Sequence, residues 1–132
     1  MDERTAACSC GALTATCRGE PARVSVCHCL DCQRRTGSAF SYNATWPEDQ
    51  VTTSGESRSF RRNSDEGYWG EHVFCPDCGG SVFYRIERRP GMVSIPVGTF
   101  ADPDFPEPTV EVYGERRHRW CEFRTAAPIE SY

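Results

Sequence analysis

Cysteine is the residue that most constrains how this chain can fold. Nine of the 132 residues are Cys, and seven of the nine fall into three short clusters. The clusters are Cys8-x-Cys10, Cys27-x-Cys29-x-x-Cys32 and Cys75-x-x-Cys78. Such usage is far above that of an ordinary domain, so we expect the thiols to brace a fold whose apolar content is only 38%.

The sequence gives no indication of secretion or membrane insertion. Its first ten residues, MDERTAACSC, lack the apolar segment of a signal peptide, and no apolar run approaches the roughly 18 residues of a membrane helix. We therefore expect the chain in a reducing cytoplasm, where disulfides are rare and clustered Cys residues usually bind metal. The odd number of Cys residues also argues against a framework made only of disulfides.

The spacing within the clusters suits zinc. A tetrahedral zinc ion holds thiolate sulfurs about 2.3 Å away, so neighbouring sulfurs lie roughly 3.8 Å apart. Two Cys residues of a C-x-C pair lie too far apart in a straight strand, and Gly11 allows the bend that Cys8 and Cys10 need. The turn residues of C-P-D-C-G-G (75–80) bring the second pair equally close.

Seven clustered thiols are one too few for two closed four-thiolate sites. The natural division is a closed structural site and an open site, whose fourth position is left to water or substrate. The closed site would contain Cys8, Cys10, Cys75 and Cys78, and the open site Cys27, Cys29 and Cys32.

Other readings of the same residues remain. The four-Cys set could be buried thiols without metal, and the three-Cys set could be an empty redox-active cluster or a second structural site closed by His28, His72 or Asp31. Because His28 lies between two expected ligands, its side chain is predicted to point away from the metal. The isolated Cys17 and Cys121 are expected to be core or surface thiols, and His118 is expected to be solvated.

The remaining pattern predicts a mainly β fold in a single domain covering residues 1–132, with its core at about 8–120 and several small coiled antiparallel sheets braced by zinc. Short β-prone runs are separated by Gly, Pro, Asn or Asp. The expected strands are 12–17, 23–27, 39–46, 58–62, 72–75, 81–87, 92–100 and 109–113. One helical turn is expected at 30–36, and the Pro-rich segment 101–108 is predicted to be an extended loop.

The charged residues narrow the range of functions. All 15 basic residues are Arg, and the absence of Lys excludes a Schiff-base enzyme and a G-K-[ST] phosphate loop. The net charge of −4 disfavours nucleic acid as the main partner. A non-enzymatic zinc module that binds protein or nucleic acid stays an alternative, because Arg is concentrated at 61–62, 88–89 and 116–119, where Trp120 follows.

Three segments together resemble a known family. They are C-S-C-G (8–11), C-H-C-L-D-C-Q-R-R-T-G-S (27–38) and F-C-P-D-C-G-G (74–80), and V-S-I-P-V-G-T-F (93–100) is a fourth match. In this order they resemble the glutathione-dependent formaldehyde-activating enzyme family, which includes centromere protein V relatives. The resemblance runs from about residue 8 to residue 100, with a weaker tail to Trp120.

The resemblance implies zinc-braced coiled sheets and the same division of the thiols into a structural and a catalytic zinc site. It also implies carbon–sulfur lyase chemistry, in which glutathione condenses with formaldehyde to S-(hydroxymethyl)glutathione. Relatives without an established substrate leave open a carbon–sulfur lyase that acts on another compound.

The residues suggest how a small thiol could be bound. A zinc ion leaves a coordinating thiol deprotonated near neutral pH, and the resulting thiolate could attack an aldehyde. Arg34 and Arg35 could bind the carboxylates of the thiol carrier, and the N–H groups of Thr36, Gly37 and Ser38 could contact an anion. His72 and Asp31 are candidates for a general base by composition only.

Overall fold

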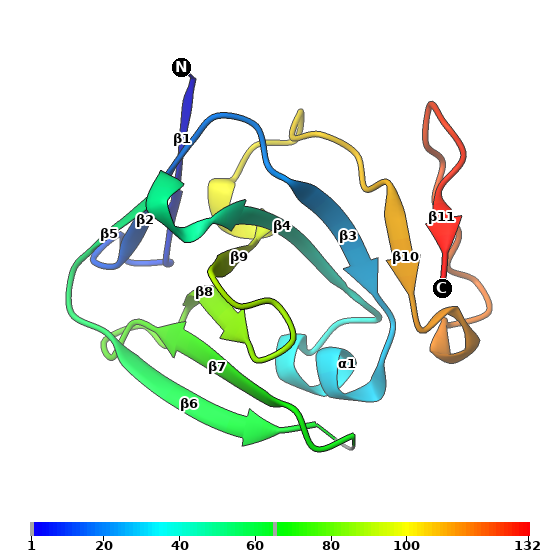
Figure 1. The fold of residues 1–132 in the computed structure, drawn as a ribbon, viewed down its shortest axis with the longest axis horizontal. Coiled ribbons are helices and arrows are strands. Elements are labelled where there is room, and N and C mark those ends of the chain that lie inside the picture. The colour runs from blue at the N-terminus through cyan, green and yellow to red at the C-terminus, as the bar shows by residue number, and fades with distance from the viewer. Residues whose placement is uncertain (1, 65) are drawn as a thin grey trace.

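The computed structural model describes residues 2–64 and 66–132. These residues form eleven strands, one α-helix and three short 3-10 helices, so the chain is mainly β, as predicted. The strands make two sheets, one of three strands and one of eight. Figure 1 shows the small sheet at one side of the molecule and the large sheet curving across the rest.

The small sheet has the order β1-β2-β5 and is antiparallel. Its strands are β1 (Glu3–Ala7), β2 (Thr14–Arg18) and β5 (Val51–Ser54). The sequence did not predict β1 or β5: β1 (ERTAA) has few residues that favour strands, and β5 (VTTS) is only four residues long. The turn after β5 packs closely on the β1–β2 loop at Gly55, where a Cβ atom would lie 2.0 Å from the Ala12 carbonyl oxygen.

The large sheet has the order β11-β10-β3-β4-β9-β8-β7-β6. Its strands are β3 (Arg23–Cys27), β4 (Ser41–Pro47), β6 (Arg58–Asn63), β7 (Trp69–Phe74), β8 (Ser81–Ile86), β9 (Met92–Pro96), β10 (Val110–Val112) and β11 (Glu130–Ser131). Neighbouring strands run antiparallel, as predicted, except that β10 runs parallel to both β3 and β11. The C-terminal part of the chain therefore returns to lie beside β3.

The two faces of the large sheet differ in polarity, because side chains alternate along its central strands. On one face Val24, Ala44 and Ile95 lie side by side and join the main hydrophobic core. The largest fully buried side chain of that core is Trp46. On the opposite face Cys27 is paired with Ser41, so the first thiol of the three-Cys set projects from the polar face.

That polar face carries a row of buried polar side chains, Ser41, Asn43, Thr45 and Ser94. Asn43 Nδ2 donates to Ser41 Oγ at 2.9 Å, and the hydroxyl oxygens of Thr45 and Ser94 lie 2.8 Å apart. Within the described residues Asn43 Oδ1 has no hydrogen-bond partner. Because buried polar groups are normally satisfied, Asn43 Oδ1 is the exception in this row, which otherwise is hydrogen-bonded within itself.

The helix α1 (Leu30–Thr36) follows the second Cys cluster and coincides with the predicted helical turn, although it extends over seven residues. It begins after Cys29, whose Sγ accepts a hydrogen bond from the Cys32 N–H, and it ends at Gly37 with φ +68°. Figure 1 shows α1 between the end of the β3–β4 pair and the β6–β7 hairpin. An ion pair of 2.9 Å between Asp31 and Arg62 joins α1 to β6.

The remaining segments connect these elements. The predicted strand 92–100 ends at Pro96, and the 3-10 helix η2 (Val97–Phe100) continues it. The other two 3-10 helices are η1 (Glu48–Gln50) and η3 (Gly114–Arg116). None of the described helices combines the length and the apolar character that crossing a bilayer requires.

Candidate metal centres and their surroundings

The four-Cys set comes together where the two sheets meet. Cys8 and Cys10 follow β1, and Cys75 and Cys78 follow β7. Their four sulfur atoms all lie within 4.8 Å of one another, and Cys10 Sγ lies 3.7 Å from both Cys8 Sγ and Cys75 Sγ. These separations match those of thiolates around one tetrahedral zinc ion, about 3.8 Å.

Local backbone geometry explains why these thiols meet. The turn after β7 closes with hydrogen bonds from the Cys75 N–H to the Gly80 carbonyl and from the Gly79 N–H to the Cys75 carbonyl. A Cβ atom on Gly80 would lie 3.2 Å from the Cys8 Cβ, so this glycine lets the two loops approach closely. The Leu13 N–H donates to Cys8 Sγ at 3.3 Å and lowers the pKa of that thiol to about 6, which favours the thiolate form that a metal binds.

The three-Cys set lies where β3 passes into α1. Cys27 is the last residue of β3, Cys29 caps α1, and Cys32 lies in its first turn. The three sulfurs lie within 4.8 Å of one another, and within the described residues no His, Cys, Asp or Glu joins them as a fourth ligand. The set is therefore an open group of three thiols rather than a closed group of four.

The pKa shifts of these three thiols favour ionisation of Cys32 over that of Cys27 and Cys29. Hydrogen bonds with the other two thiols lower the pKa of Cys32, and smaller effects of Ser41 and Arg35 act in the same direction. The same hydrogen bonds, followed by burial, raise the pKa of Cys27. Three sulfurs this close cannot all be ionised without a cation between them, so the donor set fits a zinc ion.

The three residues that the sequence offered as a fourth ligand each contact another side chain. His28 is fully buried and its Nε2 lies 2.7 Å from Glu111 Oε1, so its side chain points away from the thiols, as predicted. Asp31 is engaged by Arg62. The ring of His72 stacks on Tyr84 with 5.0 Å between centroids.

Tyr84 joins α1 to the polar face of the large sheet. It is paired with His72 on β7 and with Ser94 on β9, and the guanidinium of Arg35 lies 5.4 Å from its ring centroid. Arg35 is half-buried and, within the described residues, forms no ion pair with a carboxylate, whereas Arg34 is exposed. The sequence indicated the two Arg residues as candidates for binding a carboxylate, but it did not indicate Tyr84. The only sequence feature of Tyr84 was its place in an alternating strand.

Burial lowers the pKa of His72 to about 4, and Arg35 adds to this effect. In the pH range between about 4 and the ordinary pKa of 6.5, the unfolded chain therefore binds more protons than the folded chain. The stability that neutral His72 contributes is complete above the ordinary pKa and is lost as the pH falls toward the lower one. We expect the free energy of unfolding of a His72→Phe variant to fall less than that of the unmodified protein between about pH 7 and about pH 5.5.

Urea unfolding at both pH values measures this difference. A His118→Phe variant is the control, because it removes an exposed imidazole and should keep the original pH dependence. Equal loss of stability in the His72→Phe variant and the unmodified protein would contradict the prediction.

The expected anion contact at residues 36–38 is not supported by the backbone. The Gly37 N–H donates to the Gln33 carbonyl at 2.9 Å, and the Ser38 N–H donates to Thr36 Oγ1 at 3.1 Å. The Thr36 hydroxyl in turn donates to the Cys32 carbonyl at 2.7 Å. The end of α1 uses these groups for its own capping, so Arg35 is the better candidate for binding an anion.

The structure also places the isolated thiols of Cys17 and Cys121 and the imidazole of His118. Cys17 is fully buried in the main core, where burial raises the pKa of its thiol to about 12, and Cys121 is also buried. His118 is exposed and its Nε2 lies 2.9 Å from Gln33 Oε1. The sequence left core and surface positions open for the two thiols, and both lie in the interior.

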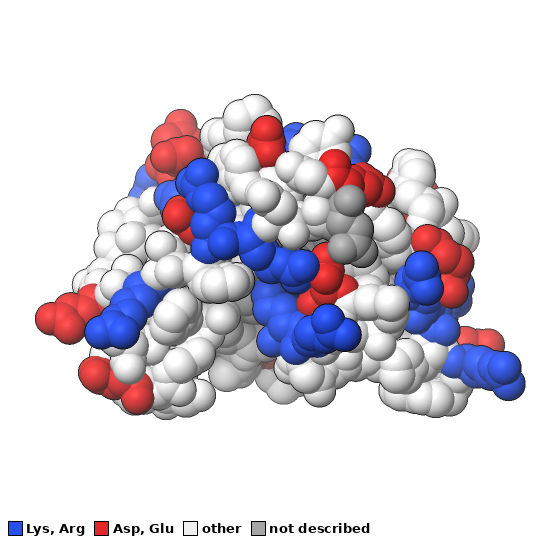
Figure 2. All heavy atoms as spheres, turned by 90° about the horizontal axis from the view of Figure 1, so that it is seen from below, with Lys and Arg blue, Asp and Glu red and all other residues white. Residues whose placement is uncertain are grey.

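On the β6 side of the molecule, acidic side chains accompany the Arg residues. Figure 2 shows basic side chains in a band across the middle of this face, with acidic side chains beside them. Arg61 lies 3.7 Å from Glu71, and Arg88 lies 3.5 Å from Glu66. Pairing of this kind weakens the alternative of a nucleic-acid-binding module.

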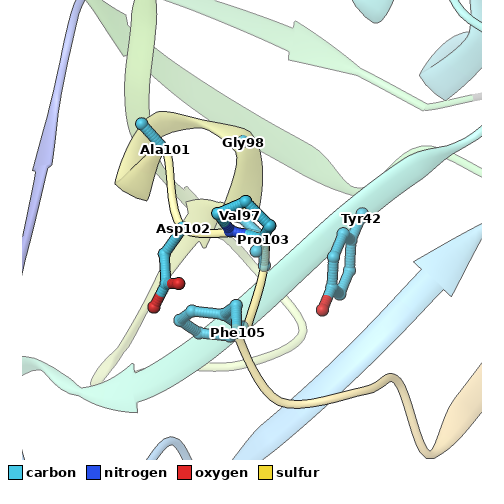
Figure 3. Close-up of a pocket in the computed structure, with 7 residues that line it drawn as sticks. All are labelled: Tyr42, Val97, Gly98, Ala101, Asp102, Pro103 and Phe105. Atoms are coloured by element: carbon cyan, nitrogen blue, oxygen red, sulfur yellow. The ribbon is translucent and has the colours of Figure 1, made fainter.

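Two cavities of the described structure are lined by residues other than Cys. One, of about 440 Å³, lies between η2, the loop after it and β4; Figure 3 shows its lining residues Tyr42, Val97, Gly98, Ala101, Asp102, Pro103 and Phe105. The other, of about 330 Å³, shares Tyr42, Pro103 and Phe105 with it. Both lie on the Tyr42 side of β4, opposite the face that carries Cys27.

Comparison with known proteins agrees with this arrangement. A family model described as glutathione-dependent formaldehyde-activating enzyme matches residues 3–116. The chain is also similar to a Rhodobacter sphaeroides protein of known crystal structure, with a TM-score of 0.58 and 19% identity over 79% of this chain and 91% of the other. At this identity the likeness supports the fold alone. No curated protein matches the chain. The family match covers both cysteine sets and most of the described fold, and the chain belongs to the glutathione-dependent formaldehyde-activating enzyme family.

Proposed function

We propose that this protein is a zinc-dependent carbon–sulfur lyase that joins a small thiol such as glutathione to formaldehyde, giving S-(hydroxymethyl)glutathione, and that also catalyses the reverse reaction. The observation that carries the proposal is the open group of three thiols beside a half-buried Arg35. Family membership supports glutathione and formaldehyde as the substrate pair. The nine thiols are all unpaired, which fits the reducing cytoplasm that we propose as its location.

Each cysteine set would hold one zinc ion. Cys8, Cys10, Cys75 and Cys78 would hold a structural ion, and Cys27, Cys29 and Cys32 a catalytic one. A zinc ion at the second site would lower the pKa of a substrate thiol that binds beside it, which keeps that thiol ionised near neutral pH.

The chain itself would bind and orient the thiol carrier. Arg35 is held over the ring of Tyr84, and a guanidinium fixed in this way can bind a carboxylate through two parallel hydrogen bonds. The exposed Arg34 would add only a screened long-range attraction.

The reaction needs no oxidant or reductant. The thiolate sulfur forms a bond to the aldehyde carbon, the carbonyl π electrons move to oxygen, and that oxygen takes up the proton that the thiol lost. We propose that this proton passes through solvent water, because burial lowers the pKa of His72 to about 4 and so makes its imidazole a weak base near neutral pH. Asp31 is also unsuitable, since it is paired with Arg62.

Removing zinc in two stages tests the proposed function. We expect about two zinc ions per chain as isolated, and mild chelation should release the ion held by three ligands first. Turnover of formaldehyde with glutathione should disappear with that first ion and return when zinc is added back. Zinc content and thiol-dependent loss of formaldehyde are the two measurements.

Bound glutathione should slow the release of the first ion, because it would supply a fourth ligand. Turnover that persists with only one zinc ion per chain would contradict the proposal. Turnover with another thiol or aldehyde, but not with glutathione and formaldehyde, would assign the same chemistry to a different substrate.

A further inference from the structure

His28 lies between two of the proposed zinc ligands, yet three of its four polar groups are held by other parts of the chain, and only Nδ1 has no partner within the described residues. Its N–H donates to the Val112 carbonyl at 3.1 Å, and its carbonyl accepts from Gln33 Nε2 at 2.9 Å. Its imidazole Nε2 donates to Glu111 at 2.7 Å. These three hydrogen bonds restrain the backbone of the neighbouring residues 27 and 29.

Glu111 is a buried carboxylate with several partners. It is 2% exposed, and besides His28 it lies 3.4 Å from Arg117 Nε and accepts a hydrogen bond from the Ser131 hydroxyl at 3.2 Å. Burying a charge is costly unless it is paired and hydrogen-bonded. A buried Glu at this position therefore requires these partners, and it holds the imidazole of His28 in one orientation.

A second contact fixes the helical side of the same cluster. Gln33, one residue after Cys32, donates from Nε2 to the Arg116 carbonyl at 3.1 Å as well as to His28. Its Oε1 accepts from His118 Nε2 at 2.9 Å. Residues 111–118 thus contact the chain on both sides of Cys29 and Cys32.

We propose that His28 and Glu111 are positioning residues that set the zinc affinity of the three-Cys site. The C-terminal segment 111–118 holds the ligand loop in a shape that suits the metal before the metal binds. Groups that orient ligands in this way typically change metal affinity about 10-fold to 100-fold. The inference rests on the proposed function only in requiring that the three thiols bind zinc.

The test is a zinc competition titration of the purified full chain with a chromophoric chelator, without thiol or aldehyde. In a Glu111→Ala variant we expect the first zinc ion to be released at a free zinc concentration about 10-fold to 100-fold higher than in the unmodified protein. Release of the second ion, held by the four-Cys set, should be unchanged. A Glu111→Gln variant, which keeps an acceptor for His28, should lie within about threefold of the unmodified protein.

Glu130→Ala is the matched control, because it removes an exposed carboxylate from the neighbouring strand β11. If Glu111→Ala fails to fold, a Gln33→Met variant replaces it in the test. Gln33 lies at the surface side of the cluster, and its loss should lower the zinc affinity of the three-Cys site about fivefold.

An equal loss of zinc affinity at both sites, or an unchanged affinity of the three-Cys site in a folded variant, would overturn the proposal. A two-zinc protein without turnover would overturn the proposed function but not this inference, whereas an unmodified protein that binds no zinc at the three-Cys site would overturn both.

Discussion

Replacing Cys78 by Ser should unfold the chain, whereas replacing Cys29 by Ser should remove one zinc ion and leave the fold intact. The four-Cys set joins the end of β1 in the small sheet to the end of β7 in the large sheet, across 65 residues of sequence between Cys10 and Cys75. A structural zinc ion contributes about 10–16 kcal/mol to folding, which is as large as the whole stability of a typical domain, about 5–15 kcal/mol.

Cys29 has a different structural role. It lies between β3 and α1, which the large sheet already holds through the pairing of β3 with β4 and β10. Its loss therefore removes a metal ligand without separating two parts of the core. Circular dichroism and zinc analysis of both variants measure the difference. Cys121→Ser is the control, because this thiol belongs to neither set and should leave both ions bound. Equal unfolding of Cys29→Ser and Cys78→Ser would contradict the assignment of a catalytic site.

Replacing Arg35 by Met should raise the KM for glutathione by about 30-fold, because about 2 kcal/mol of charge-assisted hydrogen bonding is lost. Arg35 has no carboxylate partner among the described residues and its guanidinium lies over Tyr84, close to the three thiols. Methionine keeps much of the aliphatic contact with the ring, so the fold should be unaffected. Steady-state kinetics with glutathione and formaldehyde measure the effect.

The same variant should behave normally with an uncharged thiol. With 2-mercaptoethanol, which has no carboxylate, the KM of Arg35→Met should stay within about twofold of the unmodified protein. Arg34→Met is the matched control: its neighbouring guanidinium is exposed, and we expect only a small, salt-sensitive effect. An equal rise in KM for both thiols would mean that Arg35 supports the site rather than binding a carboxylate.

Local spacing made the two cysteine sets predictable. The bends in C-x-C and C-P-D-C-G-G are short-range features, and α1 follows the second cluster directly, so residues 27–36 could be interpreted from their own neighbours. The division into four and three depends only on how many ligands one zinc ion accepts. These arguments need no knowledge of contacts between distant parts of the chain.

The surroundings of the three-Cys set were not predictable in the same way. Tyr84 and His72 join these surroundings through Arg35, whose guanidinium lies 5.4 Å from the centre of the Tyr84 ring, on which His72 stacks. Alternation along a strand does not say which face will meet another element. Glu111 was part of an expected strand, but its parallel pairing beside β3 depends on a long-range return of the chain. The capping of α1 by its own residues likewise removed N–H groups that the sequence alone made available.

The parallel return of β10 has a consequence for the order in which a newly made chain can mature. Residues 8 to 78 are sufficient to supply every ligand of the four-Cys set, whereas the hydrogen bond between His28 and Glu111 joins residues 83 positions apart. During synthesis from the N-terminus, the brace between the sheets can therefore take up its ion while the ribosome is still adding residues. The ligand loop of Cys27, Cys29 and Cys32 must wait for the strand that holds it. A growing chain would thus be able to bind its structural ion before β10 fixes the loop that carries the other three thiols.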